Sequence, residues 1–347
     1  MIAYIVRRTL LAVFTIFVIS FVAYIIVQLP EGDMVDSYFN VLYERGIGEA
    51  PGRTDYQVES LKQAWGLNRP LVVQWWDWFS SILFHADFGQ SFSTAGFSSG
   101  GPVAELIANR LPYTIYLSIF TVMITWTFAI PVGIYSAIRK NSVGDYVFTF
   151  LGFTGLAVPD FLLGLVLMYV AYAYFDHAVG GIFSGEYITA DWSVGRVVDM
   201  LSHLIIPALV IGTAGTAGLI RIMRNNLLDE LRKPYVVTAR AKGMPSWRVV
   251  VKYPVRVAIN PFISGIGGLL PALLSADAIV SVVLSLPTLG PILLDGLTRQ
   301  DANLTGAIIL MYATLTVVGV LISDLLLVVV DPRIKLTGSA RRGGEGV

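Results

Sequence analysis

The residue types that most often carry chemistry are scarce in this sequence. Its 347 residues include no cysteine and only three histidines, His85, His177 and His203. Without cysteine there are no thiol nucleophiles, disulfides or cysteine-bound metals, and the histidines are too few and too widely spaced to predict a metal cluster. No glycine is followed directly by a lysine, so the phosphate-binding pattern G-x-x-x-x-G-K-[ST] is absent. The chain is therefore not expected to hydrolyse ATP through that motif.

Three aspartates stand out because each lies within a long apolar run: Asp160, Asp277 and Asp324. An ionised aspartate at the centre of a spanning helix costs about 2.5–3.5 kcal/mol, so each is expected to face protein, water or a partner. For Asp160 and Asp277, structural hydrogen bonding, lining of a transport pathway and proton coupling all stay open. For Asp324 we expect a structural contact with a neighbouring helix. Asp160, Asp277 and Ser281 are the candidate pathway-lining residues.

The composition determines which elements must position these side chains. The chain is 55% hydrophobic and 14% charged, with a mean hydropathy of +0.69, whereas an average soluble domain is about 25% charged. A soluble globular protein is therefore excluded. The 24 Lys and Arg residues balance 24 Asp and Glu, so the basic excess that nucleic-acid binding requires is missing. We predict a protein whose surroundings are the lipid bilayer and which has no nucleic-acid partner.

Six apolar runs are long enough to cross a membrane, which takes about 20 helical residues. They are residues 9–29, 111–138, 146–175, 200–220, 257–286 and 304–330. The first is too long for the apolar part of a signal peptide and no small-residue cleavage site follows it, so a retained helix is expected. The predicted fold class is an all-α polytopic membrane protein with six transmembrane helices.

The distribution of basic residues predicts the orientation. If the N-terminus is cytoplasmic, the inner segments contain 17 of the 24 Lys and Arg residues and the outer segments seven, as the positive-inside rule requires. The net charge is then +12 inside and −9 outside, with −3 from the three intramembrane aspartates. We predict an N-in/C-in topology, because six crossings return the chain to its starting side.

The predicted organisation has four parts. Residues 1–29 form the cytoplasmic N-terminus and first helix, residues 30–110 an extracytoplasmic excursion, residues 111–335 a five-helix core, and residues 336–347 a cytoplasmic tail. The excursion contains a predicted tryptophan-rich helix at residues 71–83. For its tryptophans, anchoring at the membrane interface and stacking on a substrate both stay open.

The core includes a basic cytoplasmic loop at residues 221–256. Tyr235 to Lys242 is predicted to form a short helix that Gly243 ends, because glycine readily adopts the left-handed conformation. Trp247 to Lys252 alternates basic and apolar residues and predicts a second short helix. Two hypotheses stay open for this loop: docking of another protein, or attraction of a basic interfacial helix to anionic lipid.

The same segment, Tyr235-Val-Val-Thr-Ala-Arg-Ala-Lys-Gly243, resembles the cytoplasmic coupling loop of ATP-binding-cassette (ABC) importer permeases, known as the EAA loop. The form Thr-Ala-Arg-Ala-Lys-Gly is similar to that of the dipeptide, oligopeptide and nickel permease branch. Further segments along nearly the whole chain are similar to that branch: Met1-Ile-Ala-Tyr-Ile-Val-Arg-Arg8, Trp65-Gly-Leu-Asn-Arg-Pro-Leu71, Asp87-Phe-Gly-Gln-Ser91, Asn109-Arg-Leu-Pro-Tyr-Thr114, Pro131-Val-Gly133, His203-Leu-Ile-Ile-Pro-Ala-Leu209, Leu284-Ser-Leu-Pro-Thr-Leu-Gly290 and Asp331-Pro-Arg-Ile-Lys335.

The resemblance implies a type I ABC importer permease fold in a prokaryotic inner membrane, and a transport subunit that is not itself an enzyme. The implied partners are a second homologous permease subunit, two ATPase subunits that bind ATP and Mg, and an extracytoplasmic solute-binding protein. No cofactor is expected in this chain. The implied substrate is a peptide or a related small solute. The ATPase-coupling residues would be Tyr235, Thr238, Ala239, Arg240, Ala241, Lys242, Gly243, Trp247 and Arg248.

Some positions depart from the family pattern. Val237 and Thr238 replace the glutamate and first alanine of the general loop motif, and Pro254 is expected to interrupt the second short helix. Ser281 stands where an acidic residue is common. The alternative hypothesis is a proton-coupled secondary transporter that uses the intramembrane aspartates. An intramembrane enzyme lacks support, because the sequence has no paired catalytic residues at helical spacing.

Overall fold

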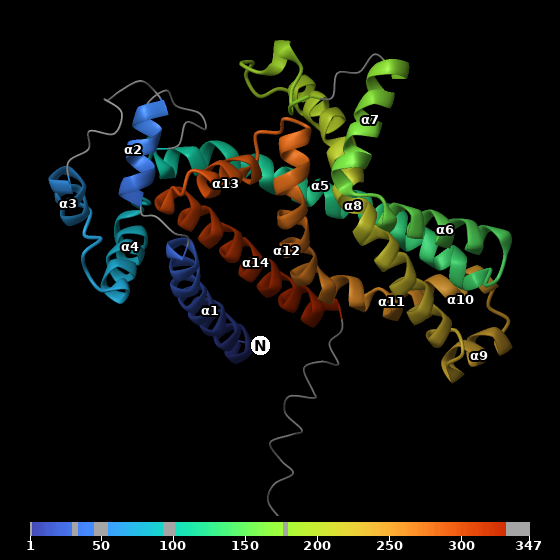
Figure 1. Ribbon diagram of the computed structural model, residues 1–347. Coiled ribbons are helices and arrows are strands. Elements are labelled where there is room, and N and C mark those ends of the chain that lie inside the picture. Colours follow the sequence, from blue (N-terminus) through green and yellow to red (C-terminus); the bar gives the residue numbers. More distant parts are fainter. Residues whose placement is uncertain (1, 30–33, 45–54, 93–100, 176–179, 331–347) are drawn as a thin grey trace, which may run out of the picture. The chain divides into compact units, whose positions relative to one another are not determined.

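The computed structural model describes residues 2–29, 34–44, 55–92, 101–175 and 180–330, and this part of the chain is mostly helical (Figure 1). The predicted tail at residues 336–347 and the Asp331 to Lys335 segment lie outside the described residues. The chain forms two compact units. The first comprises Met1–Ile115 and Pro287–Val317, and the second Tyr116–Leu286 and Val318–Val347.

The first unit contains a set of helices and one short strand pair. They are α1 (Ile2–Gln28), α2 (Met34–Glu44), α3 (Asp55–Ala64), α4 (Leu71–His85), β1 (Gln90–Ser91), β2 (Gly101–Pro102), the start of α5 (Val103–Ile138), α13 (Leu289–Thr298) and the start of α14 (Ala302–Val330). The antiparallel strands pair Gln90 with Pro102 and Ser91 with Gly101. Helix α13 was not expected from the sequence, since it falls in the short connection between two predicted spans.

The predicted tryptophan-rich helix is confirmed as α4, and its tryptophans have different surroundings. Trp75 is buried against α1, with its ring edge-on to Phe17 at 5.1 Å and to Phe21 at 5.0 Å. Its indole N–H donates a hydrogen bond to Ser20 Oγ at 3.2 Å. Trp76 is exposed. Trp75 is therefore a core residue of the first unit, which neither hypothesis from the sequence had considered.

The second unit contains the remaining helices of the described residues. They are the remainder of α5, α6 (Val143–Ala157), α7 (Asp160–Phe175), a 3₁₀ turn η1 (Gly185–Tyr187), α8 (Val194–Glu230), α9 (Pro234–Ala241), α10 (Ser246–Lys252), α11 (Pro254–Ala258), α12 (Asn260–Val283) and the end of α14. Its core joins α5, α8, α10, α11 and α12 through Ala129, Ala137, Leu219, Met223, Leu227, Val250, Val255, Ala258 and Phe262.

The helix predicted over residues 146–175 is not continuous. The segment forms α6 and α7, which are bent by 108° relative to each other. Pro159 lacks the N–H that a continuous helix needs and disfavours helical backbone at the residue before it. Val158 accordingly has φ −88° and ψ 127°, an extended conformation. Asp160 therefore lies in the first turn of α7 and not in the middle of a helix.

Two further boundaries differ from the sequence predictions. Helix α8 runs from Val194 to Glu230, so the first ten residues of the predicted loop at 221–256 are its last turns. The segment ending at Leu269 and the one beginning at Pro271 are bent by 55°. Among the described residues, α1, α5, α8 and α14 are each long and apolar enough to cross a membrane, and six spans result if each bent pair is one span.

Two helical glycines allow close helix packing. A Cβ on Gly212 would lie 2.7 Å from Thr125 Oγ1, and one on Gly267 would lie 2.6 Å from Val320 Cγ2. At four nearby glycines no atom lies within 4 Å of such a Cβ: Gly215, Gly218, Gly265 and Gly268. Close packing within this chain therefore explains why glycine stands at positions 212 and 267, but not why it stands at the other four.

Candidate functional site

The segment with the strongest functional signal is a helix, a tight turn and a second helix. Helix α9 begins with Pro234 in its first turn, where a missing N–H costs nothing. Gly243 has φ +76°, the left-handed conformation predicted for it. Its N–H donates to Arg240 O at 2.9 Å, and Met244 N donates to Ala239 O at 3.4 Å. These bonds satisfy carbonyls at the end of α9 before α10 begins at Ser246.

A small apolar core fixes α9 against α10. Val236 and Val249 are fully buried, Ala239 is buried beside them, and Met244 and Tyr253 pack against the three. Pro254 starts α11 directly after this core, so it separates α10 from α11, as the sequence predicted. The two short helices therefore form one rigid piece, which in the following paragraphs is named the α9–α10 piece.

The other side of the α9–α10 piece is exposed. Trp247 is 65% exposed and Val237 60%, and the Arg248 guanidinium lies 5.3 Å from the centre of the Trp247 ring. Of the predicted coupling residues, Ala239 is buried and these are exposed: Tyr235, Thr238, Arg240, Ala241, Lys242, Gly243, Trp247 and Arg248. The piece thus presents aromatic, apolar and basic side chains together, which is the composition of a surface that binds another molecule.

Contacts at both ends tie the α9–α10 piece to the long helices of the second unit. The Tyr235 hydroxyl donates a hydrogen bond to the Glu230 carboxylate at the end of α8. Burial and the Glu230 carboxylate raise the pKa of Tyr235 to about 12, so this hydroxyl stays a donor at neutral pH. Val250 on α10 packs into the core shared by α5, α8 and α12. The α9–α10 piece is therefore in direct contact with these helices.

A buried ion pair stands at the start of α6. The Asp145 side chain is 4% exposed and accepts two hydrogen bonds from Arg224 on α8, from Nε at 3.1 Å and from Nη2 at 3.0 Å. Asn141 N donates to the same carboxylate at 3.0 Å, and Asp145 N donates to Ser142 Oγ at 3.3 Å. Such a two-point pair fixes both distance and orientation between two helices. It connects the turn after α5 to α8.

Sequence reasoning missed this pair, although one signal was present. A serine three residues before an acidic residue, at the start of an apolar run, is the pattern of a helix N-terminus. Ser142 and Asp145 fit that pattern, and it would have placed Asp145 at the beginning of α6. The identity of its partner Arg224, 79 residues away, had no local signal.

The three aspartates of the apolar runs have different surroundings. Asp277 is 3% exposed and accepts a hydrogen bond from the Ser281 hydroxyl, one turn along α12. Asp160 is half-buried at the start of α7, and Asp324 is half-buried on α14. The structure thus brings Asp277 and Ser281 together, while Asp160 lies on another helix. Pathway lining by these residues stays a prediction.

The segment Asp87-Phe-Gly-Gln-Ser91 forms a second ordered site, in the first unit. Gly89 has φ +81°, and its N–H donates to Asp87 Oδ1 at 2.9 Å. A Cβ on Gly89 would lie 2.9 Å from Asn303 Nδ2, so both conformation and space require glycine there. Asn303 Nδ2 in turn donates to Gln90 O at 3.0 Å.

Asp301 joins this segment to the start of α14. Its side chain is fully buried and accepts hydrogen bonds from Ser91 Oγ at 2.6 Å, Phe92 N at 3.0 Å and Leu304 N at 3.0 Å. The last of these is an N-cap bond. Sequence reasoning had counted Asp301 only as an outer charge, although an aspartate directly before an apolar run is a helix-start signal.

We expect Asp301→Ala to lower the free energy of unfolding by about 3 kcal/mol, because it removes a helix cap and leaves the Ser91 hydroxyl without this acceptor. Ser91→Ala, which removes one hydrogen bond, should cost about 1 kcal/mol. Unfolding of the purified protein by SDS in mixed micelles would measure both. Equal midpoints for Asp301→Ala and the unchanged protein would contradict this assignment.

Several apolar helices long enough to cross a membrane, with the exposed α9–α10 piece packed against them, are typical of a multi-pass membrane protein. The chain belongs to the family of binding-protein-dependent transport system inner membrane components, whose family model matches residues 129–336. A model for the N-terminal part of such membrane components matches residues 1–118.

Relatives cover nearly the whole chain. The oligopeptide transport system permease protein AppB of Bacillus subtilis is 34% identical over 96% of this chain and 100% of its own length. The dipeptide transport system permease protein DppB of Escherichia coli is 30% identical over 96% and 99%. The nickel import system permease protein NikB of Staphylococcus aureus is 26% identical over 95% and 90%. The resemblance to this branch is confirmed.

The protein is therefore a permease subunit of an ABC importer, and permease subunits of this family are not enzymes themselves. The alternative of a proton-coupled secondary transporter is not supported, because the relatives over the full length are importer permeases.

Proposed function

We propose that this chain is one of two homologous permease subunits that together form the translocation pathway of a peptide importer in a prokaryotic inner membrane. Two ATPase subunits bind ATP and Mg on the cytoplasmic side, and a solute-binding protein delivers the substrate from outside. The chain crosses the membrane six times with both termini inside, each bent helix pair forming one span. The relatives include oligopeptide, dipeptide and nickel permeases, which favours peptides as the substrate class.

The observation that supports this proposal most directly is the α9–α10 piece. It has its own core of Val236, Ala239 and Val249, so we expect it to move as one body. Its exposed face combines Trp247 with basic side chains. Such a face suits an acidic or mixed protein surface better than a purely hydrophobic one. We assign it as the docking surface for an ATPase subunit.

The proposed mechanism follows from the contacts of this piece. When ATP closes the two ATPase subunits, the α9–α10 piece moves with the subunit bound to it. The Tyr235 to Glu230 hydrogen bond and the packing of Val250 pass this movement to α8 and its neighbours. The helices then rock from an inward-facing to an outward-facing state, and the binding protein releases substrate into the pathway. Asp160, Asp277 and Ser281 are the proposed lining residues.

Reconstitution tests this function. With the partner subunits and the binding protein in liposomes, peptide uptake should require ATP and should persist when the proton gradient is collapsed. Proton-driven uptake by the purified chain alone would contradict the proposal.

A matched pair of tryptophan variants tests the docking surface. Trp247→Ser should reduce co-purification of the ATPase subunit by roughly thirtyfold, since loss of an aromatic residue at an interface centre costs about 2 kcal/mol. Trp192→Ser is the control: Trp192 is 57% exposed and also lies against an arginine, Arg196, at 4.7 Å. Trp192 lies in the connection before α8, so Trp192→Ser should leave co-purification of the ATPase subunit unchanged. Equal effects of the two substitutions would argue against docking at Trp247.

A further inference from the structure

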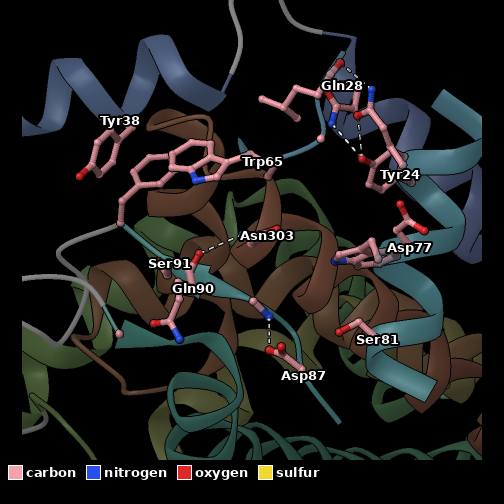
Figure 2. A pocket seen from close by; sticks show the side chains of 18 of the residues that line it. Tyr24, Gln28, Tyr38, Trp65, Asp77, Ser81, Asp87, Gln90, Ser91 and Asn303 are labelled. Carbon is pink, nitrogen blue, oxygen red and sulfur yellow. Dashed lines mark hydrogen bonds between the residues drawn. The ribbon is translucent and has the colours of Figure 1, made fainter. Parts of the chain in front are cut away.

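The first unit contains a cavity that the transport mechanism above does not use. Its volume is about 620 Å³, within the usual range of small-molecule sites. It lies among α1, α2, α4, β1 and the start of α14 (Figure 2). All of its described lining residues belong to this one unit. The cavity is therefore a property of this chain and needs no partner to form.

Aromatic rings line the cavity as two pairs. Tyr24 of α1 lies against Trp78 of α4, with ring centres 5.6 Å apart and planes inclined by 41°. Tyr38 of α2 lies edge-on to Trp65, with ring centres 5.4 Å apart. Figure 2 shows Tyr38 and Trp65 together and Tyr24 on a different part of the wall. The faces of such rings carry partial negative charge and attract cations.

The polar part of the lining is rich in hydrogen-bond acceptors. Asp77 and Asp87 lie in the wall, together with four side-chain amides: Gln28, Gln74, Gln90 and Asn303. The described lining residues include no lysine, arginine or histidine. An anion would therefore meet the negative charge of Asp87 and the Asp77 carboxylate, which is paired with Arg69, and no cationic side chain in the described lining. A cation would meet both carboxylates and aromatic faces.

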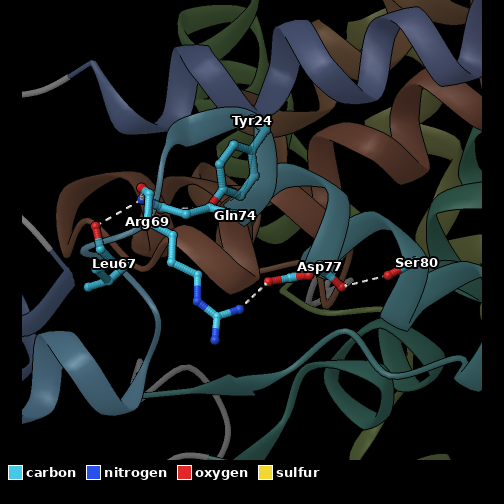
Figure 3. Close-up of polar contacts among 6 residues, drawn as sticks. All are labelled: Tyr24, Leu67, Arg69, Gln74, Asp77 and Ser80. Atoms are coloured by element: carbon cyan, nitrogen blue, oxygen red, sulfur yellow. Dashed lines mark hydrogen bonds and ion pairs between the residues drawn. The ribbon is translucent and has the colours of Figure 1, made fainter.

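The wall is held in place before any ligand binds (Figure 3). Tyr24 donates to Gln74 Oε1 at 3.1 Å, and the Gln74 amide nitrogen donates to Leu67 O at 2.9 Å and Arg69 O at 2.7 Å. Arg69 pairs with Asp77 Oδ2 at 2.9 Å. These bonds link α1, α4 and the turn before α4. Ligand binding would therefore cost little conformational entropy for ordering the site, which favours affinity.

The charge of the surrounding segment agrees with the lining. Residues 30–110 contain ten Asp and Glu against five Lys and Arg. A net negative charge raises the local concentration of cations and speeds their association. The electrostatic potential of the same negative charges disfavours binding of anionic ligands.

We propose that this cavity binds an organic ammonium group, carried either by a small free cation such as choline or by the N-terminus of a peptide. The aromatic pairs surround the cationic head, and the Asp87 carboxylate neutralises it, since Asp77 is already paired with Arg69. This site lies outside the coupling mechanism, and its ligand binding is measured without ATP or partner subunits. If the proposed coupling role fails, the ammonium site is unaffected. If the ammonium site fails, the coupling role is unaffected.

Choline and its uncharged tert-butyl analogue test the proposal, because they have the same shape and differ in charge. Titration of the purified full-length chain in nanodiscs, followed by calorimetry, should show choline binding about tenfold or more tightly than the analogue. Trp65→Leu and Asp87→Asn should each weaken choline binding by about tenfold. Asparagine at position 87 can still accept the hydrogen bond from Gly89 N, so this variant removes the charge and keeps the turn.

Trp76→Leu is the matched control. Trp76 is exposed on α4 and is not part of the described lining, so choline affinity should be unchanged. If choline binds, equal affinity for choline and the uncharged analogue, or unchanged choline affinity in both Trp65→Leu and Asp87→Asn, would overturn the proposal. A lack of binding of both choline and trialanine would also overturn it.

Trialanine and N-acetyl-trialanine distinguish the two sources of the ammonium group. Binding of trialanine that acetylation abolishes would assign the site to a peptide N-terminus. Binding of choline without trialanine would assign it to a small free cation. Both outcomes support the ammonium site, and binding of acetylated and free peptide with equal affinity would argue against it.

Discussion

Gly243→Arg should leave the protein inserted and folded while peptide uptake by the reconstituted importer falls by roughly ten- to a hundredfold. No atom lies within 4 Å of a Cβ at this position, so the fold has room for a side chain. The left-handed backbone, with φ +76°, costs about 1 kcal/mol for a residue other than glycine. The larger effect comes from a bulky side chain that would hold the two surfaces of the proposed ATPase interface apart, which costs about 2–3 kcal/mol.

Two controls separate interface loss from backbone strain. Asparagine tolerates the left-handed conformation better than most residues, so Gly243→Asn should transport nearly as well as the unchanged protein. Gly181 has φ +85° and also no atom within 4 Å of a Cβ, but it lies outside the α9–α10 piece. Gly181→Arg should therefore keep ATPase co-purification that Gly243→Arg loses. Normal uptake in Gly243→Arg, or equal losses in the asparagine and arginine variants, would contradict the docking assignment.

Arg224→Met is expected to lower the free energy of unfolding by about 3 kcal/mol. It leaves the Asp145 carboxylate buried without its ionic partner, and breaking a buried pair by removing one member costs about 3–5 kcal/mol. The lower end applies, because the Arg224 side chain is 24% exposed. Unfolding by SDS in mixed micelles measures the difference.

Arg221→Met provides the control, because it removes the same charge from the same side of the same helix. Arg221 is exposed and lies 4.9 Å from the centre of the Phe153 ring, an interaction worth about 0.5–1 kcal/mol. The double variant Asp145→Leu with Arg224→Met should be more stable than Arg224→Met alone, since no charge is then left unpaired. Equal stability of the two single arginine variants would show that the pair contributes nothing.

Much of the coupling segment was predictable because its signals are local. A glycine after a run of helix formers predicts the turn at Gly243, and Pro254 predicts the break between α10 and α11. The face that α9 buries was not predictable in the same way. Ala239 and Val236 are buried only because α10 folds back onto them, and that contact depends on the geometry of the turn.

The breaks in the spanning helices show a different limit. An apolar run of thirty residues predicts a span from its hydropathy alone, and Pro159 indicated a weakened place within it. Hydropathy shows that a segment is apolar but not in which direction its helix runs, so the 108° bend between α6 and α7 was not predicted. The bend changes the position of Asp160, which starts a helix and is not at the centre of one.

The sequence by itself determined that this chain belongs in a membrane, where its apolar runs lie, and which segment resembles a coupling loop. These properties depend on sums over neighbouring residues, such as hydropathy and backbone preference, which are present before the chain folds. Only the tertiary structure decided which distant polar groups meet. Asp145 pairs with Arg224 across 79 positions, and Ser91 with Asp301 across 210. The physical reason is that a buried charge needs a specific partner within hydrogen-bond distance, and packing of the helices, not sequence separation, determines which partner is there.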